Sequence, residues 1–237
     1  MSETRTQAGR IALVALFVTA LTTAQLTASK LLAFGLPFEL PVTGASIVLP
    51  GAALAYALTF FASDCYSELY GRRAAQVMVN VGFAMNFVLL ALVWSTILAP
   101  AANPDAAGQY RAVLAPGTNI VLGSLLAYIV SQNWDVLVFH RIRDATGASM
   151  LWLRNIASTA TSQAIDTVLF VGVAFYVAPR VLGFGDPLPV SVILSLIVGQ
   201  YLLKLLIALL DTPFVYAVVA FFGGSTIETE NNAWAAD

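Results

Sequence analysis

The sequence predicts an all-α fold: a polytopic membrane protein built as a bundle of six transmembrane helices. Of its 237 residues, 59% are hydrophobic and only 10% are charged, whereas soluble domains carry about 25% charged residues. Six apolar runs are each long enough to cross a hydrocarbon core about 30 Å thick. One bundle accounts for residues 1–223, and we expect residues 224–237 to form a polar, disordered C-terminal tail.

The predicted helices are separated by loops that contain proline or glycine, the residues that most often interrupt helices. They span approximately residues 11–34, 46–64, 74–99, 118–139, 151–177 and 189–212. The last run can continue to Phe222 if the chain passes a break at Pro213. The first run is too long for the core of a signal peptide and further spans follow it, so we expect an uncleaved first helix.

Arginines are distributed unevenly between alternate loops, and this asymmetry predicts how the chain is inserted. With the N-terminus inside, six arginines fall on the inner side and two on the outer side. The inner set is Arg5, Arg10, Arg72, Arg73, Arg141 and Arg143, and the outer set is Arg111 and Arg180. We therefore expect a multi-pass protein of the cell membrane with both termini in the cytoplasm.

The composition argues against several functional classes. Cys65 and His140 are the only residues of their types, which excludes an intrachain disulfide and a cysteine or multi-histidine metal site. No basic tract suggests a nucleic-acid partner. A serine protease needs a base near its nucleophile, and the sequence shows no such pairing. We expect neither an enzyme nor a bound cofactor, and the polar groups lack the repeated ring pattern of an ion channel.

The stretch Leu151 to Phe170 organises the chain, because it places a polar stripe on an apolar helix. At about 100° per residue, the stripe is roughly 100° wide and has Gln163 at its edge. Its members are Asn155, Ser158, Thr159, Ser162 and Asp166. A polar stripe facing lipid is costly, so this one should face protein or a water-filled cavity.

The fourth predicted helix repeats this pattern. Its stripe contains Ser124, Tyr128, Ser131 and Asp135, with Gln132 at the edge. The motif Ser-Gln-x-x-Asp occurs at 131–135 and again at 162–166, on two neighbouring helices that must run antiparallel. Each helix therefore carries a carboxylate beside an amide. The sixth helix adds Lys204, which shares a face with Gln200 and Asp211.

These side chains suit recognition of a planar heterocycle. A carboxylate accepts from ring N–H and exocyclic amine groups, while glutamine and asparagine both donate and accept. Aromatic side chains such as Trp134 and Tyr128 could stack on such a ring. Structural interpretations remain open: Asp166 and Lys204 could form an ion pair, Trp134 could belong to an interfacial belt, and the serines could serve helix packing.

Three segments resemble the queuosine precursor transporters, the vitamin-uptake-transporter family. They are Leu151-Trp-Leu-Arg-Asn155 followed by Ser158-Thr159, Ser162-Gln163, Asp166-Thr167 and Phe170, then Asp64 through Tyr70-Gly71-Arg72, and Ser131-Gln132 with Asp135 and Phe139. The likeness covers roughly residues 20–215. It puts Asn155, Ser158, Gln163, Asp166, Gln132 and Asp135 at matching motif positions.

The resemblance implies six helices akin to the substrate-binding subunits of energy-coupling-factor transporters. It also implies import of 7-deazaguanine precursors of modified tRNA bases, such as 7-cyano-7-deazaguanine. The alternative is a binding subunit of an ATP-driven vitamin uptake system with another cargo. This chain has no G-x-x-x-x-G-K-[ST] phosphate loop, so ATP-driven uptake would need a separate ATPase module as a partner. A second copy of the chain also stays open as a partner. Proton coupling through Asp166 or Asp135 is the competing energy source.

Overall fold

The computed structural model describes residues 2–41, 43–146 and 150–223. Its contacts divide the chain into two compact units. Unit 1 comprises Met1–Thr27, Gly51–Leu92 and Leu203–Asp237, and unit 2 comprises Ala28–Pro50 and Val93–Leu202. The predicted polar tail lies outside the described residues.

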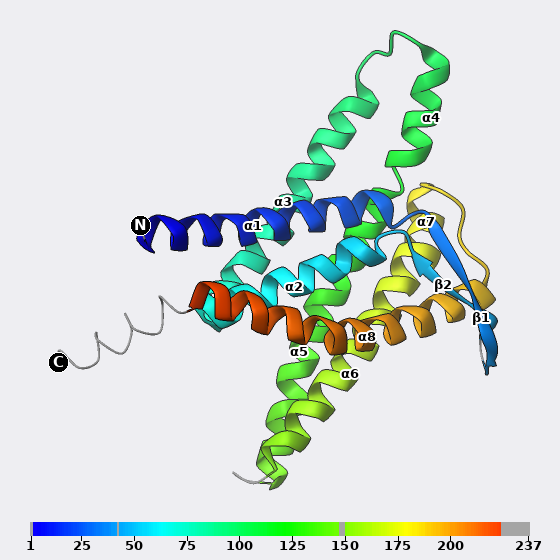
Figure 1. The fold of residues 1–237 in the computed structure, drawn as a ribbon. Helices are drawn as coiled ribbons and strands as arrows, with labels where there is room; N and C mark the ends of the chain where they lie inside the picture. The colour runs from blue at the N-terminus through cyan, green and yellow to red at the C-terminus, as the bar shows by residue number, and fades with distance from the viewer. Residues whose placement is uncertain (1, 42, 147–149, 224–237) are drawn as a thin grey trace. The chain divides into compact units, whose positions relative to one another are not determined.

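The described chain is mostly helical, as predicted (Figure 1). Its helices are α1 (Ser2–Thr27), α2 (Ala53–Tyr70), α3 (Arg72–Leu98), α4 (Pro104–Leu114), α5 (Gly117–Thr146), α6 (Leu151–Gly172), α7 (Ala178–Leu182) and α8 (Val190–Gly223). A π-helical turn, η1 (Val173–Val177), joins α6 to α7, and two strands, β1 (Leu31–Leu40) and β2 (Gly44–Pro50), follow α1.

Five helical segments of the described chain are long and apolar enough to cross a membrane, rather than the six expected. They are Gln7–Thr27, Arg72–Leu98, Pro104–Thr146, Ile156–Leu182 and Val190–Phe221. The segment that does not qualify is α2, which has 18 residues and carries Asp64 and Glu68 in its second half. A polytopic membrane protein is thus confirmed, and the count of six is not.

The β-hairpin corrects the predicted ends of the first two helices. Residues 31–34 and 46–50 were expected to be helical, but Leu31 pairs with Pro50 and Phe34 with Ile47 in an antiparallel register. Gly35, Pro37 and Pro41 interrupt this stretch, and glycine and proline disfavour a helix interior. The backbone is therefore satisfied by pairing between strands.

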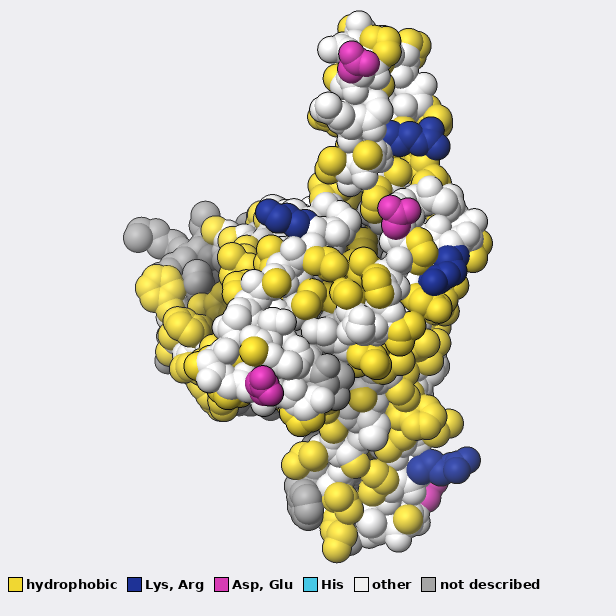
Figure 2. All heavy atoms as spheres, turned by 90° about the vertical axis from the view of Figure 1, so that its right-hand side faces the viewer, with side chains coloured by type: hydrophobic (Ala, Val, Ile, Leu, Met, Phe, Trp, Pro, Cys, Tyr) yellow, Lys and Arg dark blue, Asp and Glu magenta, His cyan; other side chains and the backbone are white. Residues whose placement is uncertain are grey.

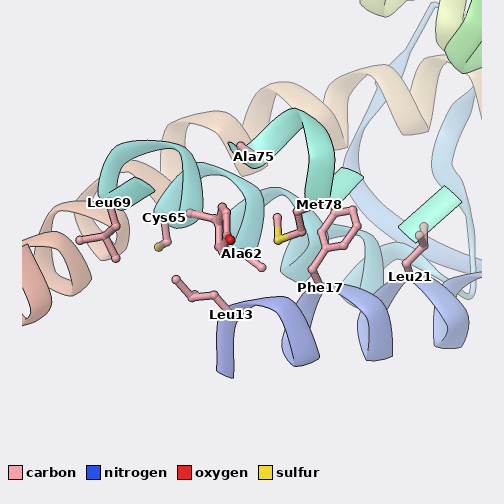
Figure 3. Close-up of a cluster of buried hydrophobic side chains, with 9 residues drawn as sticks. Leu13, Phe17, Leu21, Ala62, Cys65, Leu69, Ala75 and Met78 are labelled. Carbon is pink, nitrogen blue, oxygen red and sulfur yellow. The ribbon is translucent and has the colours of Figure 1, made fainter. Parts of the chain in front are cut away.

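In unit 1, an apolar core joins α1 to α2 and α3 (Figure 3). Leu13, Phe17 and Leu21 recur every four residues on α1, and this spacing places them on one face. They meet Ala62, Cys65, Tyr66 and Leu69 of α2 and Ala75 and Met78 of α3. Gly71 turns the chain between α2 and α3 with φ +85° and ψ 155°, a conformation that only glycine adopts readily.

In unit 2, α5 and α6 lie side by side and run antiparallel (Figure 1). Gly123 allows their close approach: a Cβ atom there would lie 2.8 Å from the Ala174 Cβ and 3.1 Å from the Phe170 carbonyl oxygen. The π-helical turn has a local cause in Pro179, which lacks the N–H that would bond to the Phe175 carbonyl. Leu188 supplies that bond instead, with its backbone N–H 2.9 Å from the Phe175 oxygen.

The surface is rich in hydrophobic side chains, and charged groups are sparse on the face shown in Figure 2. Many large apolar residues of the spanning helices are exposed, including Leu92 of α3, Ile129 of α5, Val168 of α6 and Leu209 of α8. Water would oppose such exposure, whereas hydrocarbon does not. This surface supports membrane insertion of the long helices.

Candidate functional site

The polar stripes of α5 and α6 face each other across the helix interface. The Ser131 hydroxyl of α5 lies 3.3 Å from Oδ1 of Asp166 on α6. The Ser162 hydroxyl of α6 lies 3.3 Å from Oδ1 of Asp135 on α5. The two Ser-Gln-x-x-Asp motifs are thus joined reciprocally, the serine of each bonding the aspartate of the other.

This reciprocity follows from the sequence repeat. Serine and aspartate four residues apart lie on the same face of a helix, about one turn apart. When two such helices pack antiparallel with the motifs at the same level, the serine of one faces the aspartate of the other at both ends. The arrangement satisfies polar groups that would be costly against lipid.

Burial differs between the members of this α5–α6 polar interface. Ser131 and Ser162 are each only 5% exposed, and Ser158 is also buried. Asp135, Gln163 and Asp166 are half-buried, and Gln132 is exposed. The serines therefore lie within the helix contact, while the carboxylates and Gln163 keep surface that another molecule can reach.

A further hydrogen bond joins α5 to α6. The Trp134 indole N–H of α5 donates to the Thr161 hydroxyl of α6 at 3.1 Å. Thr161 in turn donates to the Ala157 carbonyl of its own helix at 2.7 Å. Sequence reasoning missed Thr161, which flanks the predicted stripe, although threonine can reach a backbone carbonyl one turn earlier in any helix.

Two predicted site residues need separate treatment. The side chain of Asn155 lies outside what the structure describes, although its backbone belongs to α6. Lys204 belongs to unit 1, where its ammonium lies 5.8 Å from the centre of the Tyr56 ring. The ion pair of Lys204 with Asp166 stays a prediction.

Asn119 is a buried amide of unit 2 that the sequence did not identify as a structural or functional residue. Asn119, near the start of α5, is 2% exposed, and its Nδ2 donates to the Phe184 carbonyl at 2.6 Å. This bond ties α5 to the segment after α7. Its signal in the sequence is weak, because a single asparagine beside Gly117 also fits a helix start.

An apolar groove of about 210 Å³ lies on another face of α6. Its walls come from α6 and the unit 2 part of α8, and consist of Ala164, Thr167, Val168, Ile197, Val198, Tyr201 and Leu202. Ala164 and Val168 lie on the side of α6 opposite the polar stripe. The groove suits an apolar group and lacks the carboxylates that a polar heterocycle needs. Within the described residues, no cluster of three histidine, cysteine or acidic side chains could hold a metal.

Comparisons with known proteins agree on one family. Residues 50–218 match the family described as "Putative vitamin uptake transporter". A relative from Bacillus subtilis (strain 168), "Probable queuosine precursor transporter", is 35% identical over 164 residues, which cover 68% of each chain. No solved structure matches this chain.

Proposed function

Because this chain belongs to the vitamin-uptake-transporter family, we propose that it imports a 7-deazaguanine precursor of tRNA base modification, such as 7-cyano-7-deazaguanine. The family establishes a membrane transporter rather than an enzyme. The cargo is suggested by the name of the Bacillus subtilis relative and by the donor and acceptor groups of the α5–α6 polar interface.

The observation that carries the proposal is the reciprocal pairing of Ser131 with Asp166 and Ser162 with Asp135. A deazaguanine presents a ring N–H beside an exocyclic amine, and a carboxylate can accept from both. Each serine contact is 3.3 Å long, beyond the usual 2.7–2.8 Å of such bonds. A long hydrogen bond is weak, so a solute with two well-aimed donors can compete for the carboxylate.

The proposed contacts divide by chemistry. Asp166 and Asp135 accept from the donors of the solute, and Gln163 and Gln132 offer an amide to its carbonyl and ring nitrogens. Ser158 and Ser162 line the interface, and Asn155 extends the stripe by sequence position. Tyr128 and Phe170, both half-buried in unit 2, provide aromatic faces for stacking.

The test is uptake in cells that cannot synthesise the precursor. External 7-cyano-7-deazaguanine should restore the modified tRNA base only when this chain is expressed. An exposed carboxylate variant, Asp144→Asn on α5, provides an expression-matched positive control. Correctly inserted protein that restores no modified base would contradict the proposal.

A second candidate is a binding subunit that works with a separate ATPase and carries another vitamin. The family description names vitamin uptake, and this supports the second candidate. Purification of the chain from its native membrane together with an ATPase would support this candidate. Uptake by the chain alone, reconstituted in vesicles without ATP, would exclude it, and an uncoupler would then show whether protons drive transport.

A further inference from the structure

Asn86 of α3 is a buried residue whose side-chain amide makes no hydrogen bond within the described chain. Its side chain is 0% exposed, and neither Oδ1 nor Nδ2 has a hydrogen-bond partner in the part of the chain that the structure describes. Buried amides are normally paired, because removing them from water without a partner is costly. Asn119 illustrates the usual case, since its Nδ2 donates to a backbone carbonyl.

Asn86 continues the buried face of α3 within unit 1. The buried residues of this helix are Ala75, Met78, Gly82 and Asn86, at intervals of three and four residues. Met78 belongs to the apolar core of unit 1, and a Cβ atom on Gly82 would lie 2.5 Å from the Phe17 ring and 3.3 Å from Leu21 Cδ2. The face is therefore tightly packed before Asn86, so an apolar residue would be the expected continuation.

The facing helix also changes from apolar to polar at the next turn. Leu13, Phe17 and Leu21 recur every four residues on α1, and Gln25 follows at the same interval. Gln25 is only 3% exposed. Both helices thus place a buried carboxamide one turn beyond the Phe17–Leu21–Gly82 contact, where packing alone favours leucine or alanine.

We propose that Asn86 is a solute-binding residue of unit 1 and that its carboxamide forms hydrogen bonds with a donor–acceptor edge of the transported free base. A carboxamide offers one acceptor and one donor side by side, so it pairs with a neutral edge that carries an N–H beside an acceptor. Two such edges of a deazaguanine contain a ring N–H: ring N1–H beside the carbonyl, and N9–H beside N3. The second edge exists only in the free base, because the sugar of a nucleoside occupies N9. The inference rests on the proposed function.

The decisive variant is Asn86→Leu, which keeps the approximate size and removes both hydrogen-bonding atoms. Binding of radiolabelled 7-cyano-7-deazaguanine to the purified full chain should weaken at least about tenfold. The melting temperature without solute should stay the same or rise, because an unsatisfied buried amide has been removed. Asn80→Leu is the matched control: Asn80 is exposed on the same helix, accepts from Gln76, and should leave binding unchanged.

Two analogues identify the edge. An analogue without the ring carbonyl tests the first edge, and an N9-methyl analogue tests the second. The wild-type chain should discriminate against one of them, and Asn86→Leu should lose most of that discrimination, since hydrogen-bonding sites reject analogues that leave their groups unpaired.

The outcomes separate the two proposals. If the wild-type chain binds no 7-cyano-7-deazaguanine, the proposed function fails. If the wild-type chain binds and Asn86→Leu binds equally well, only the role of Asn86 is overturned. A leucine variant that inserts poorly or melts several degrees lower also overturns it, because the amide would then serve the protein's own hydrogen bonding.

Discussion

Ser131 illustrates how a single hydroxyl can connect the two helices with either a hydrogen-bond acceptor or a donor at position 166. Its oxygen lies 3.3 Å from both the Tyr128 carbonyl and Asp166 Oδ1. A hydroxyl has one proton to donate. It donates to Asp166 when the carboxylate accepts, and it can donate to Tyr128 when an amide at position 166 donates to it. The contact therefore survives the replacement of the carboxylate by an amide.

Asp166→Asn separates the binding role of the carboxylate from its structural role. The amide can still bond Ser131, so we expect normal insertion and a melting temperature within a few degrees of wild type. Uptake should fall sharply, because a neutral amide accepts from the donors of the solute less strongly than a carboxylate. Initial uptake rates, normalised to inserted protein, provide the measurement. Normal uptake would remove Asp166 from the site.

The reciprocal geometry predicts matched effects for two serines on different helices. Ser131→Ala and Ser162→Ala each remove one contact to an aspartate. Each should destabilise the purified protein by about 0.6 kcal/mol, the average for such bonds between membrane helices. Thermal unfolding in detergent measures both. A large effect of one serine with none of the other would show that the two contacts are not equivalent.

At the scale of helices and strands, periodicity predicted the elements whose polar and apolar faces are distinct. The fifth predicted helix, 151–177, coincides with α6 and η1 together, and Ser162 and Asp166 of its polar stripe contact α5, whereas Thr159 of the same stripe is exposed. The hairpin of β1 and β2 was missed because a continuous apolar run has no period to distinguish strand from helix. Pro213 did not end α8, which continues to Gly223. The serine–aspartate pairs between α5 and α6 could not be predicted from the sequence. The sequence shows which residues share a helix face, but it does not determine the axial position at which two helices pack against each other.

Close packing of α5 against the end of α6 predicts opposite results for two glycines. A Cβ at Gly123 would meet the backbone N of Ala174 at 3.1 Å as well as its Cβ at 2.8 Å, so the helices would have to separate. Gly123→Ala should destabilise the protein by about 1–3 kcal/mol. Gly172→Ala is the control, because no atom lies within 4 Å of a Cβ there and alanine favours helix. If both variants melt alike, the close approach at Gly123 does not limit the packing.

At the scale of the whole molecule, α2 decides how many times the chain crosses the membrane. Its 18 residues extend roughly 27 Å, just short of a hydrocarbon core of about 30 Å, and it is absent from the five qualifying segments. If α2 crosses, Gln7 and Arg72 lie on the same side of the membrane; if it does not, α1 alone separates them and they lie on opposite sides.

The distribution of arginines favours a crossing by α2, since it places Arg5 and Arg10 on the same side as Arg72 and Arg73. We expect a membrane-impermeant maleimide to leave Gln7→Cys and Arg72→Cys unlabelled in intact cells and to label both after lysis. Asp186→Cys, exposed in the loop before α8, should label in intact cells. Cys65, which is buried, is first replaced by alanine to remove its background. Labelling of only one of Gln7→Cys and Arg72→Cys in intact cells would show that α2 does not cross; if Gln7→Cys is the variant that labels, the positive charges near the N-terminus do not set the orientation either.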